Sequence, residues 1–264
     1  MEKFGKVIVK LRIPILILSF LLLIPSAIGY FNTRVNYDIL YYLPNEIETM
    51  QGQDILMDDF NKGAYAMVVV QNMDTKSTDR LIKKVENVDH VAQVISYTGI
   101  VGEDVPSEIV PSKFRKYFEN DSTDTTLFAI FFDNTTSSDD TMNAIIQIRE
   151  QTEGQAFISG MSAVVTDTKN LSEKETPLYV LIAVVLVCIV LAIFMDSFLV
   201  PVFFMLSIGM AIVYNLGSNY FLGEVSYITK ALAAVLQLGV TLDYSIFLWH
   251  SYKEAKEELL KLKT

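Results

Sequence analysis

The sequence is poor in the residues that build disulfides and metal sites. Its 264 residues include one cysteine, Cys188, and two histidines, His90 and His250. A single thiol excludes an intrachain disulfide framework and a Cys-x-x-Cys metal motif. Two isolated histidines give no support for a zinc site or a Ser-His-Asp triad. We therefore expect no bound metal and no cofactor.

Two short motifs fall short of the sites that they resemble. Residues 133–140 are rich in aspartate, but the loop lacks the glycine at position six and the acid at position twelve of a calcium-binding EF-hand. We interpret it as a solvated turn with a helix cap. Gly160-Met-Ser162-Ala163 lacks the second glycine of a nucleophile elbow, and no histidine is placed as its base. We therefore predict that the protein is not an enzyme.

Positive charge is scarce between residues 32 and 177. This block has 24 Asp and Glu against 12 Lys and Arg, so its net charge is −12 in a chain whose total is −10. An acidic surface repels nucleic-acid backbones and anionic lipid headgroups. We therefore expect no nucleic-acid partner.

Long apolar runs are abundant outside that block. Four runs are each close to the roughly 20 residues that cross the hydrocarbon core of a bilayer. They are Leu11–Phe31, Leu178–Met195, Phe198–Leu222 and Tyr227–Trp249. The sequence therefore predicts a membrane protein with four transmembrane helices in a lipid bilayer and a polar domain inserted between helices one and two.

Basic residues flank the first and the fourth runs. They are Lys3, Lys6, Lys10, Arg12, Lys253, Lys256, Lys261 and Lys263. The positive-inside rule then places both termini in the cytoplasm of a plasma or inner membrane, and the insert outside. The first run exceeds the 7–15 residues of a cleavable signal sequence, so we expect it to be retained. The predicted parts are the N-terminus with helix one (1–31), the extracytoplasmic domain (32–177), helices two to four (178–249) and a cytoplasmic tail (250–264).

The insert alternates strand-like and helix-like segments. Runs of β-branched residues flank amphipathic segments with helical spacing, first around a helix that we expect Ser77 to cap. Two successive βαβ units predict a ferredoxin-like α+β domain, in which helices cover one face of a four-stranded sheet. The predicted strands are 64–71, 91–97, 127–132 and 155–159, and the predicted helices are 45–60, 77–88, 107–118 and 139–151.

The fourth apolar run carries an acid, Asp243, in its cytoplasmic half. An ionised carboxylate in hydrocarbon costs at least about 2.5–3.5 kcal/mol, so such residues usually face a bundle interior or a wet cavity and serve proton or ion pathways. Tyr244 adds a hydroxyl, and Gly239, one turn earlier on the same face, lets another backbone come close. We predict that Asp243 and Tyr244 relay protons. The alternative is a neutral, hydrogen-bonded structural contact.

The stretch from Gly239 to Leu248, which contains this Asp-Tyr pair, resembles the fourth transmembrane helix of the resistance-nodulation-division (RND) superfamily, in particular its mycobacterial membrane protein large (MMPL) type. Further segments fit the same pattern in chain order. They are Gly160–Ala163 with Asp167, the Asp196-Ser197 corner with Pro201, Ser226–Thr229, and Tyr252 with Glu254. Many relatives have Arg before Ser at that corner, where this chain has Asp196.

The resemblance implies proton-motive-force-driven efflux of lipids or other hydrophobic compounds, with a porter-type external domain that guides substrate. Such proteins are tandem duplications with six spans and one external domain in each half. The resemblance therefore implies a partner, either a missing second half of the transporter or another subunit. Two alternatives remain open: a SecDF-like protein-export accessory, which should lack the Asp-Tyr pair, and a non-transporting lipid sensor or scaffold.

Overall fold

The fold is described from a computed structural model of the chain, which divides into two compact units. The sheet unit comprises residues 37–171, and the helical unit comprises residues up to Asn36 together with those from Ser172 onward. The predicted Asp196-Ser197 corner lies outside the described residues. Those residues are 2–38, 40–102, 105, 109–120, 122–152, 154–195 and 199–261.

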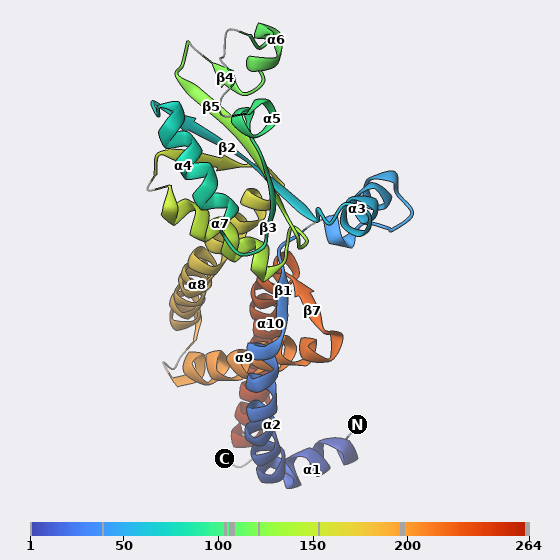
Figure 1. Ribbon diagram of the computed structural model, residues 1–264. Coiled ribbons are helices and arrows are strands. Elements are labelled where there is room, and N and C mark those ends of the chain that lie inside the picture. The colour runs from blue at the N-terminus through green and yellow to red at the C-terminus, as the bar shows by residue number, and fades with distance from the viewer. Residues whose placement is uncertain are drawn as a thin grey trace. The chain divides into compact units, whose positions relative to one another are not determined.

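An antiparallel sheet with the strand order β3-β5-β2-β6 forms the centre of the sheet unit (Figure 1). Its central pair aligns Ala64 with Phe132 and Gln71 with Thr125. A short strand, β4 (Glu119–Asn120), also pairs with β5. The principal strands are β2 (Ala64–Gln71), β3 (Val91–Ile95), β5 (Thr125–Phe132) and β6 (Ala156–Ser159), and all four were predicted from the sequence to within two residues at each end.

Two helices, α4 (Thr75–Glu86) and α7 (Asp139–Gln151), pack against one face of this sheet. Alternate strand residues point toward them, because successive side chains of a strand face opposite sides. Each large apolar side chain buried there contributes roughly 1.5–3 kcal/mol. The residues of this core with the lowest exposure are Ala66, Val68, Val70, Val85, Phe128, Ile130, Phe132, Ile145 and Ile148.

The helix caps confirm one prediction and correct another. Ser138 caps α7 by accepting a hydrogen bond from the Asp140 N–H, so the aspartate-rich loop ends in a helix cap as expected. The predicted cap of α4 was wrong: the cap is Asp74, whose carboxylate accepts from the Ser77 N–H at 3.3 Å. Aspartate and serine are about equally good caps, so the sequence contained two candidates three residues apart.

Asp74 makes the stability of α4 sensitive to pH. The hydrogen bond from Ser77 lowers the pKa of this carboxyl below its usual 3.8. Its stabilising contribution is therefore complete above the unfolded-state pKa and is lost as the pH falls through the lower folded-state pKa. We expect Asp74→Ala to lower the Tm of the sheet unit at pH 7 and to lower it less at pH 2.5. Thermal unfolding followed by circular dichroism measures both; an equal decrease at the two pH values would contradict the charge effect.

The remaining segments of the sheet unit depart further from the prediction. A helix, α3 (Glu48–Asp58), forms within the expected segment 45–60. The helix expected over 107–118 is wrong within the described residues: α5 (Tyr97–Val101) precedes it, and α6 (Ser112–Arg115) is a single turn. This part of the chain is held by a cluster of three aromatic rings. The Tyr97 ring packs against the rings of Phe114 and Phe118, with centroid distances of 6.5 and 6.4 Å.

The helix that contains the second span, α8 (Met161–Phe194), begins 17 residues before the predicted start at Leu178. Gly160 makes the turn from β6 into α8 with φ +105°, and its Cα passes close to Ala66, where an added Cβ would lie 3.2 Å from the Ala66 Cα. The first turns of α8 are tied to α7 by ion pairs: Arg149 binds Asp167 through both carboxylate oxygens, and Lys169 Nζ lies 3.0 Å from Asp139 Oδ1. The helix therefore starts in a segment that contains charged residues, and the apolar run only continues it.

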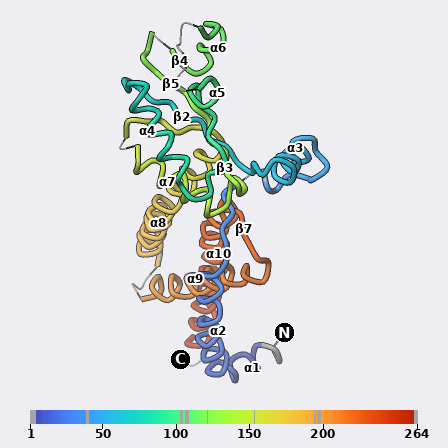
Figure 2. Tube along the Cα trace, viewed as in Figure 1, coloured from blue at the N-terminus to red at the C-terminus, as the bar shows by residue number. Residues whose placement is uncertain are grey.

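The helical unit contains long apolar helices (Figures 1 and 2). A short helix, α1 (Glu2–Lys10), leads into α2 (Arg12–Asn32), and α9 (Leu199–Ser218) and α10 (Tyr227–Lys261) follow α8. Four helices of the described chain, α2, α8, α9 and α10, are long and apolar enough to cross a membrane, as predicted. Their large apolar side chains are mostly exposed, which is the surface that lipid would cover.

A two-stranded parallel sheet joins the end of α2 to the start of α10. Its strands are β1 (Arg34–Asn36) and β7 (Glu224–Ser226), aligned from the Arg34–Glu224 pair to the Asn36–Ser226 pair. The Asn36 amide donates to Glu224 Oε1 at 3.3 Å. The sequence did not predict this sheet, because each strand has only three residues. The short 3₁₀ helix η2 (Asn219–Leu222) connects α9 to β7.

Candidate functional site

The predicted relay residues lie on α10, which is continuous from Tyr227 to Lys261. Residues 227–249 include no proline, and the rest of the helix is rich in Lys, Glu, Ala and Leu, which favour helix. The helix therefore extends twelve residues beyond Trp249, the predicted end of the span, into the predicted cytoplasmic tail. Because each residue turns the helix by about 100°, α10 has two faces with different surroundings.

One face of α10 packs against α9. Leu238 is buried, and a chain of polar groups lies beside it. The Asn215 amide of α9 donates to Gln237 Oε1 at 3.4 Å, and the Gln237 amide donates to Thr241 Oγ1 at 2.9 Å. Ser245 continues the chain by donating to the Thr241 carbonyl at 2.8 Å. Of these three hydrogen bonds, the one from Asn215 to Gln237 joins α9 to α10, and the other two hold the polar side chains in place within α10.

The other face of α10 carries the predicted relay pair. Asp243 is about 200° around the helix from Thr241, so it points away from α9. Asp243 is exposed, and the Tyr244 side chain is 74% exposed. Among the residues that the structure describes, neither the carboxylate nor the phenol has a hydrogen-bond partner. We call this side of α10, with Gly239, Val240, Asp243, Tyr244 and Phe247, the relay face.

Gly239 was predicted to let another backbone approach the acid. A Cβ built on Gly239 meets no atom within 4 Å in the described part of the chain. Among the residues that the structure describes, the three predicted residues thus lie on one open surface of α10 that no other helix contacts.

The close backbone approach occurs instead between α2 and α9. A Cβ built on Gly217 would lie 2.7 Å from the Ser26 Cα and nearer still to its carbonyl oxygen, and one built on Gly29 would lie 3.1 Å from the Gly217 carbonyl carbon. The Tyr214 hydroxyl adds a hydrogen bond to the Ser19 carbonyl of α2. The small residues Ser26 and Gly29 of α2 were the available signal, because helix interfaces in membranes are enriched in small residues that let two backbones come close.

Lys230 lies near the start of α10 and contacts α2. Its Nζ lies 5.0 Å from the centre of the Tyr30 ring, a cation–π contact. Lys230 is thirteen residues, or about 20 Å of helix, from Asp243, so these two residues do not pair. Lys230 therefore helps to hold the ends of α2 and α10 together and lies outside the relay face.

The chemistry that these residues offer is proton binding at a carboxylate and hydrogen bonding at a phenol. No group of three or more His, Cys, Asp or Glu residues suited to a metal ion occurs among the described residues. The sequence model of the MMPL family matches residues 42–263, which include the sheet unit from Tyr42 and all of the last three apolar helices. No curated protein matches the chain.

Proposed function

Because this chain belongs to the MMPL family, whose members are membrane transporters of hydrophobic substrates, we propose that it exports lipids or other hydrophobic compounds driven by the proton-motive force. The observation that carries the coupling is a carboxylate, Asp243, on an otherwise apolar helix face. Among the described residues it has no cation or hydrogen-bond donor that would make it a structural contact.

Asp243 and Tyr244 act as the proton relay in this proposal. A carboxylate in hydrocarbon is costly when ionised and much less so when protonated. Proton binding therefore lets the relay face move between a wet and a dry environment, and proton release reverses the change. Tyr244, the next residue of the relay face, offers a hydroxyl that is able to donate or accept a hydrogen bond in the same relay.

The relay face requires a partner, and we propose helices from a second half of the transporter or from another subunit. Val240, Tyr244 and Phe247 are all more than half exposed beside Asp243, so a covering helix would bury apolar area and remove the acid from lipid. Gly239 suits the closest approach, because no atom stands within 4 Å of the position of a Cβ.

We assign residues 37–171 of the polar block 32–177 to an extracytoplasmic, ferredoxin-like domain of the porter type. The strand order β3-β5-β2-β6, with α4 and α7 on one face, supports the ferredoxin-like assignment. The basic residues before α2 and at the end of α10 support the assignment of both termini to the cytoplasm.

Topology is tested by accessibility. A cysteine placed at the exposed position Thr135 in a Cys188→Ser background should react with a membrane-impermeant thiol reagent added to intact cells. Cysteines placed at Gly5 and Lys256 should react only after the membrane is opened, because the flanking cations keep both ends inside. Labelling of Gly5→Cys and Lys256→Cys from opposite sides would contradict the four-span arrangement.

The transport activity is tested in inverted membrane vesicles from cells that carry the gene and from cells that lack it. A pH gradient with the vesicle lumen acidic should drive uptake of a fluorescent fatty acid or phospholipid only when the protein is present. A protonophore should stop this uptake. A pH dye should report proton exit together with uptake. Lipid-dependent binding of a protein partner without proton flux would favour the sensor or scaffold alternative.

A further inference from the structure

Positive charge is concentrated on α4, in an otherwise acidic part of the chain. Four of the 12 Lys and Arg residues between 32 and 177 lie on this one helix, although the block has 24 Asp and Glu. They are Lys76, Arg80, Lys83 and Lys84. Arg80 and Lys84 are four residues apart, so their side chains leave the helix on the same side.

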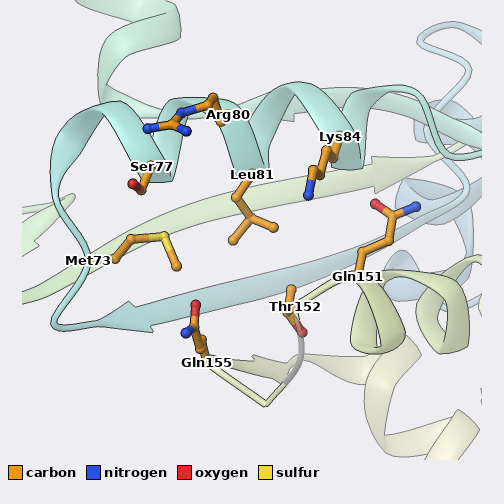
Figure 3. A pocket seen from close by; sticks show the side chains of 8 residues that line it. All are labelled: Met73, Ser77, Arg80, Leu81, Lys84, Gln151, Thr152 and Gln155. Atoms are coloured by element: carbon orange, nitrogen blue, oxygen red, sulfur yellow. The ribbon is translucent and has the colours of Figure 1, made fainter.

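Arg80 and Lys84 line a groove of about 330 Å³ between α4 and the turn that follows α7 (Figure 3). That volume is in the range of small-molecule sites, which begin near 300 Å³. Figure 3 shows Lys84 and Leu81 directed from α4 into the groove, with Thr152 and Gln155 on the opposite wall. The lining residues are Met73, Ser77, Arg80, Leu81, Lys84, Gln151, Thr152 and Gln155, and none of these is acidic.

The cations of the groove are available for a ligand. The Lys84 ammonium has no partner among the described residues. The Arg80 Nε donates to the Lys76 carbonyl at 3.3 Å, and its terminal nitrogens have no partner within the described chain. Two other cations of the same unit are paired, because Arg149 binds Asp167 and Lys169 binds Asp139. Asp74, which lies outside the groove lining, interacts electrostatically with Arg80, whereas the lining itself offers these cations no carboxylate.

The other lining groups complement these two charges. The amides of Gln151 and Gln155 and the hydroxyl of Ser77 are further donors. The Thr152 hydroxyl donates its hydrogen to the Arg149 carbonyl, so it has no hydrogen left to donate to a ligand and only lines the groove. Leu81 and Met73 provide an apolar surface beside the polar groups.

We propose that this groove binds a phosphate monoester, with the phosphoryl group at Arg80 and Lys84 and the organic group against Leu81 and Met73. A phosphate monoester carries a charge of about −1.5 to −2 at neutral pH and offers three acceptor oxygens. The Lys84 ammonium attracts those oxygens as a point charge, and the Arg80 guanidinium, which Figure 3 shows directed along α4 toward Ser77, adds positive charge to the same groove. Inorganic phosphate shares the head group but has nothing to place on the apolar surface. The inference concerns ligand binding alone and goes beyond the export function.

The test uses the full chain in a neutral detergent and a chloride buffer, with n-butyl phosphate and inorganic phosphate as probes. Mass spectrometry measures the acetylation rate of each lysine. Saturating n-butyl phosphate should slow the acetylation of Lys84 by about fivefold or more, because a bound anion holds the ammonium protonated and covered. Lys83, the adjacent residue outside the groove lining, should change by less than about twofold.

Two variants with the same change of charge serve as matched probes of affinity. Lys84→Gln should weaken n-butyl phosphate binding in isothermal titration calorimetry by about tenfold, the usual effect of losing a hydrogen bond to a charged group. Lys83→Gln should weaken it by less than about twofold, because Lys83 leaves α4 about 100° around the helix from Lys84 and does not line the groove. Equal weakening by both variants would show diffuse attraction to a basic helix and would overturn the groove as a site.

Comparison of n-butyl phosphate with inorganic phosphate shows whether the groove prefers a phosphate monoester or free phosphate. Tighter binding of n-butyl phosphate than of inorganic phosphate supports the monoester, because only the former buries carbon against Leu81 and Met73. Equal affinities would overturn the monoester assignment in favour of free phosphate. Unchanged acetylation of Lys84 at saturating concentrations of both probes would overturn the site in the wild-type protein, without reference to any variant.

Discussion

Asp243→Asn is expected to abolish gradient-driven export while leaving abundance and membrane insertion near those of the wild type. Asparagine keeps the shape of the side chain but cannot take up and release a proton. Insertion should be unaffected because the side chain is exposed on α10 and, within the described chain, has no partner to lose. The inverted-vesicle assay, with lipid uptake and proton exit recorded together, measures the effect. Undiminished uptake by Asp243→Asn would leave Asp243 as a structural polar residue and remove it from the relay.

Two further variants sharpen this result. Tyr244→Phe removes one hydroxyl from the relay face and should weaken export without abolishing it, since the carboxylate still carries the proton. Glu257→Gln is the matched control, because it makes the same carboxylate-to-amide change on the same helix, at an exposed position beyond the apolar run. It should export like the wild type. A loss in Glu257→Gln equal to that in Asp243→Asn would show that the position of the acid is unimportant.

Gly217→Ala is expected to destabilise the packing of α2 on α9. The new Cβ would have to occupy space already filled by the backbone of Ser26, and a backbone cannot rotate away as a side chain can. Overpacking typically costs about 1–3 kcal/mol, and a backbone obstacle places the cost at the upper end of that range or above it. We expect a lower Tm of the full chain in a neutral detergent, measured by circular dichroism at the helical minimum.

Gly209→Ala provides the matched control on the same helix. A Cβ at Gly209 meets nothing within 4 Å, so the change keeps the gain in helix propensity and avoids the clash. Its Tm should equal or slightly exceed that of the wild type. If both alanine variants melted like the wild type, the α2–α9 contact would be looser in the membrane protein than the structure shows.

The helices and strands could largely be predicted from the sequence, because their signals are local. The period of apolar residues in 139–151 gave α7 with its observed ends, and the β-branched run at 64–71 gave β2. The errors occurred where two possible helix caps competed, or where a helix extended beyond the apolar run that predicted it. Asp74 and Ser77 were rival caps, and the polar start of α8 at Met161 lies outside the apolar run that marked its span.

The candidate site was only partly accessible to the same reasoning. Asp243 was identified because it is an acid in an apolar run. The apolar neighbours show that the segment lies in hydrocarbon, where an ionised carboxylate is costly. The polar chain from Asn215 through Gln237 to Thr241 was missed, since amides and hydroxyls are common and only the pairing of two helices makes them a network. The groove beside Lys84 was missed for the same reason.

The sequence by itself determined the membrane class, the four apolar helices, the two βαβ units and the acid on α10. Each of these depends on a pattern within a few turns or one strand. Only the tertiary structure decided that Gly217 meets Ser26, that Tyr214 bonds to Ser19 across 195 residues, and that β1 pairs with β7. Such contacts depend on which surfaces meet, and many pairings of apolar helices bury similar area. The choice among them rests on close backbone approach and a few hydrogen bonds, which no local pattern encodes.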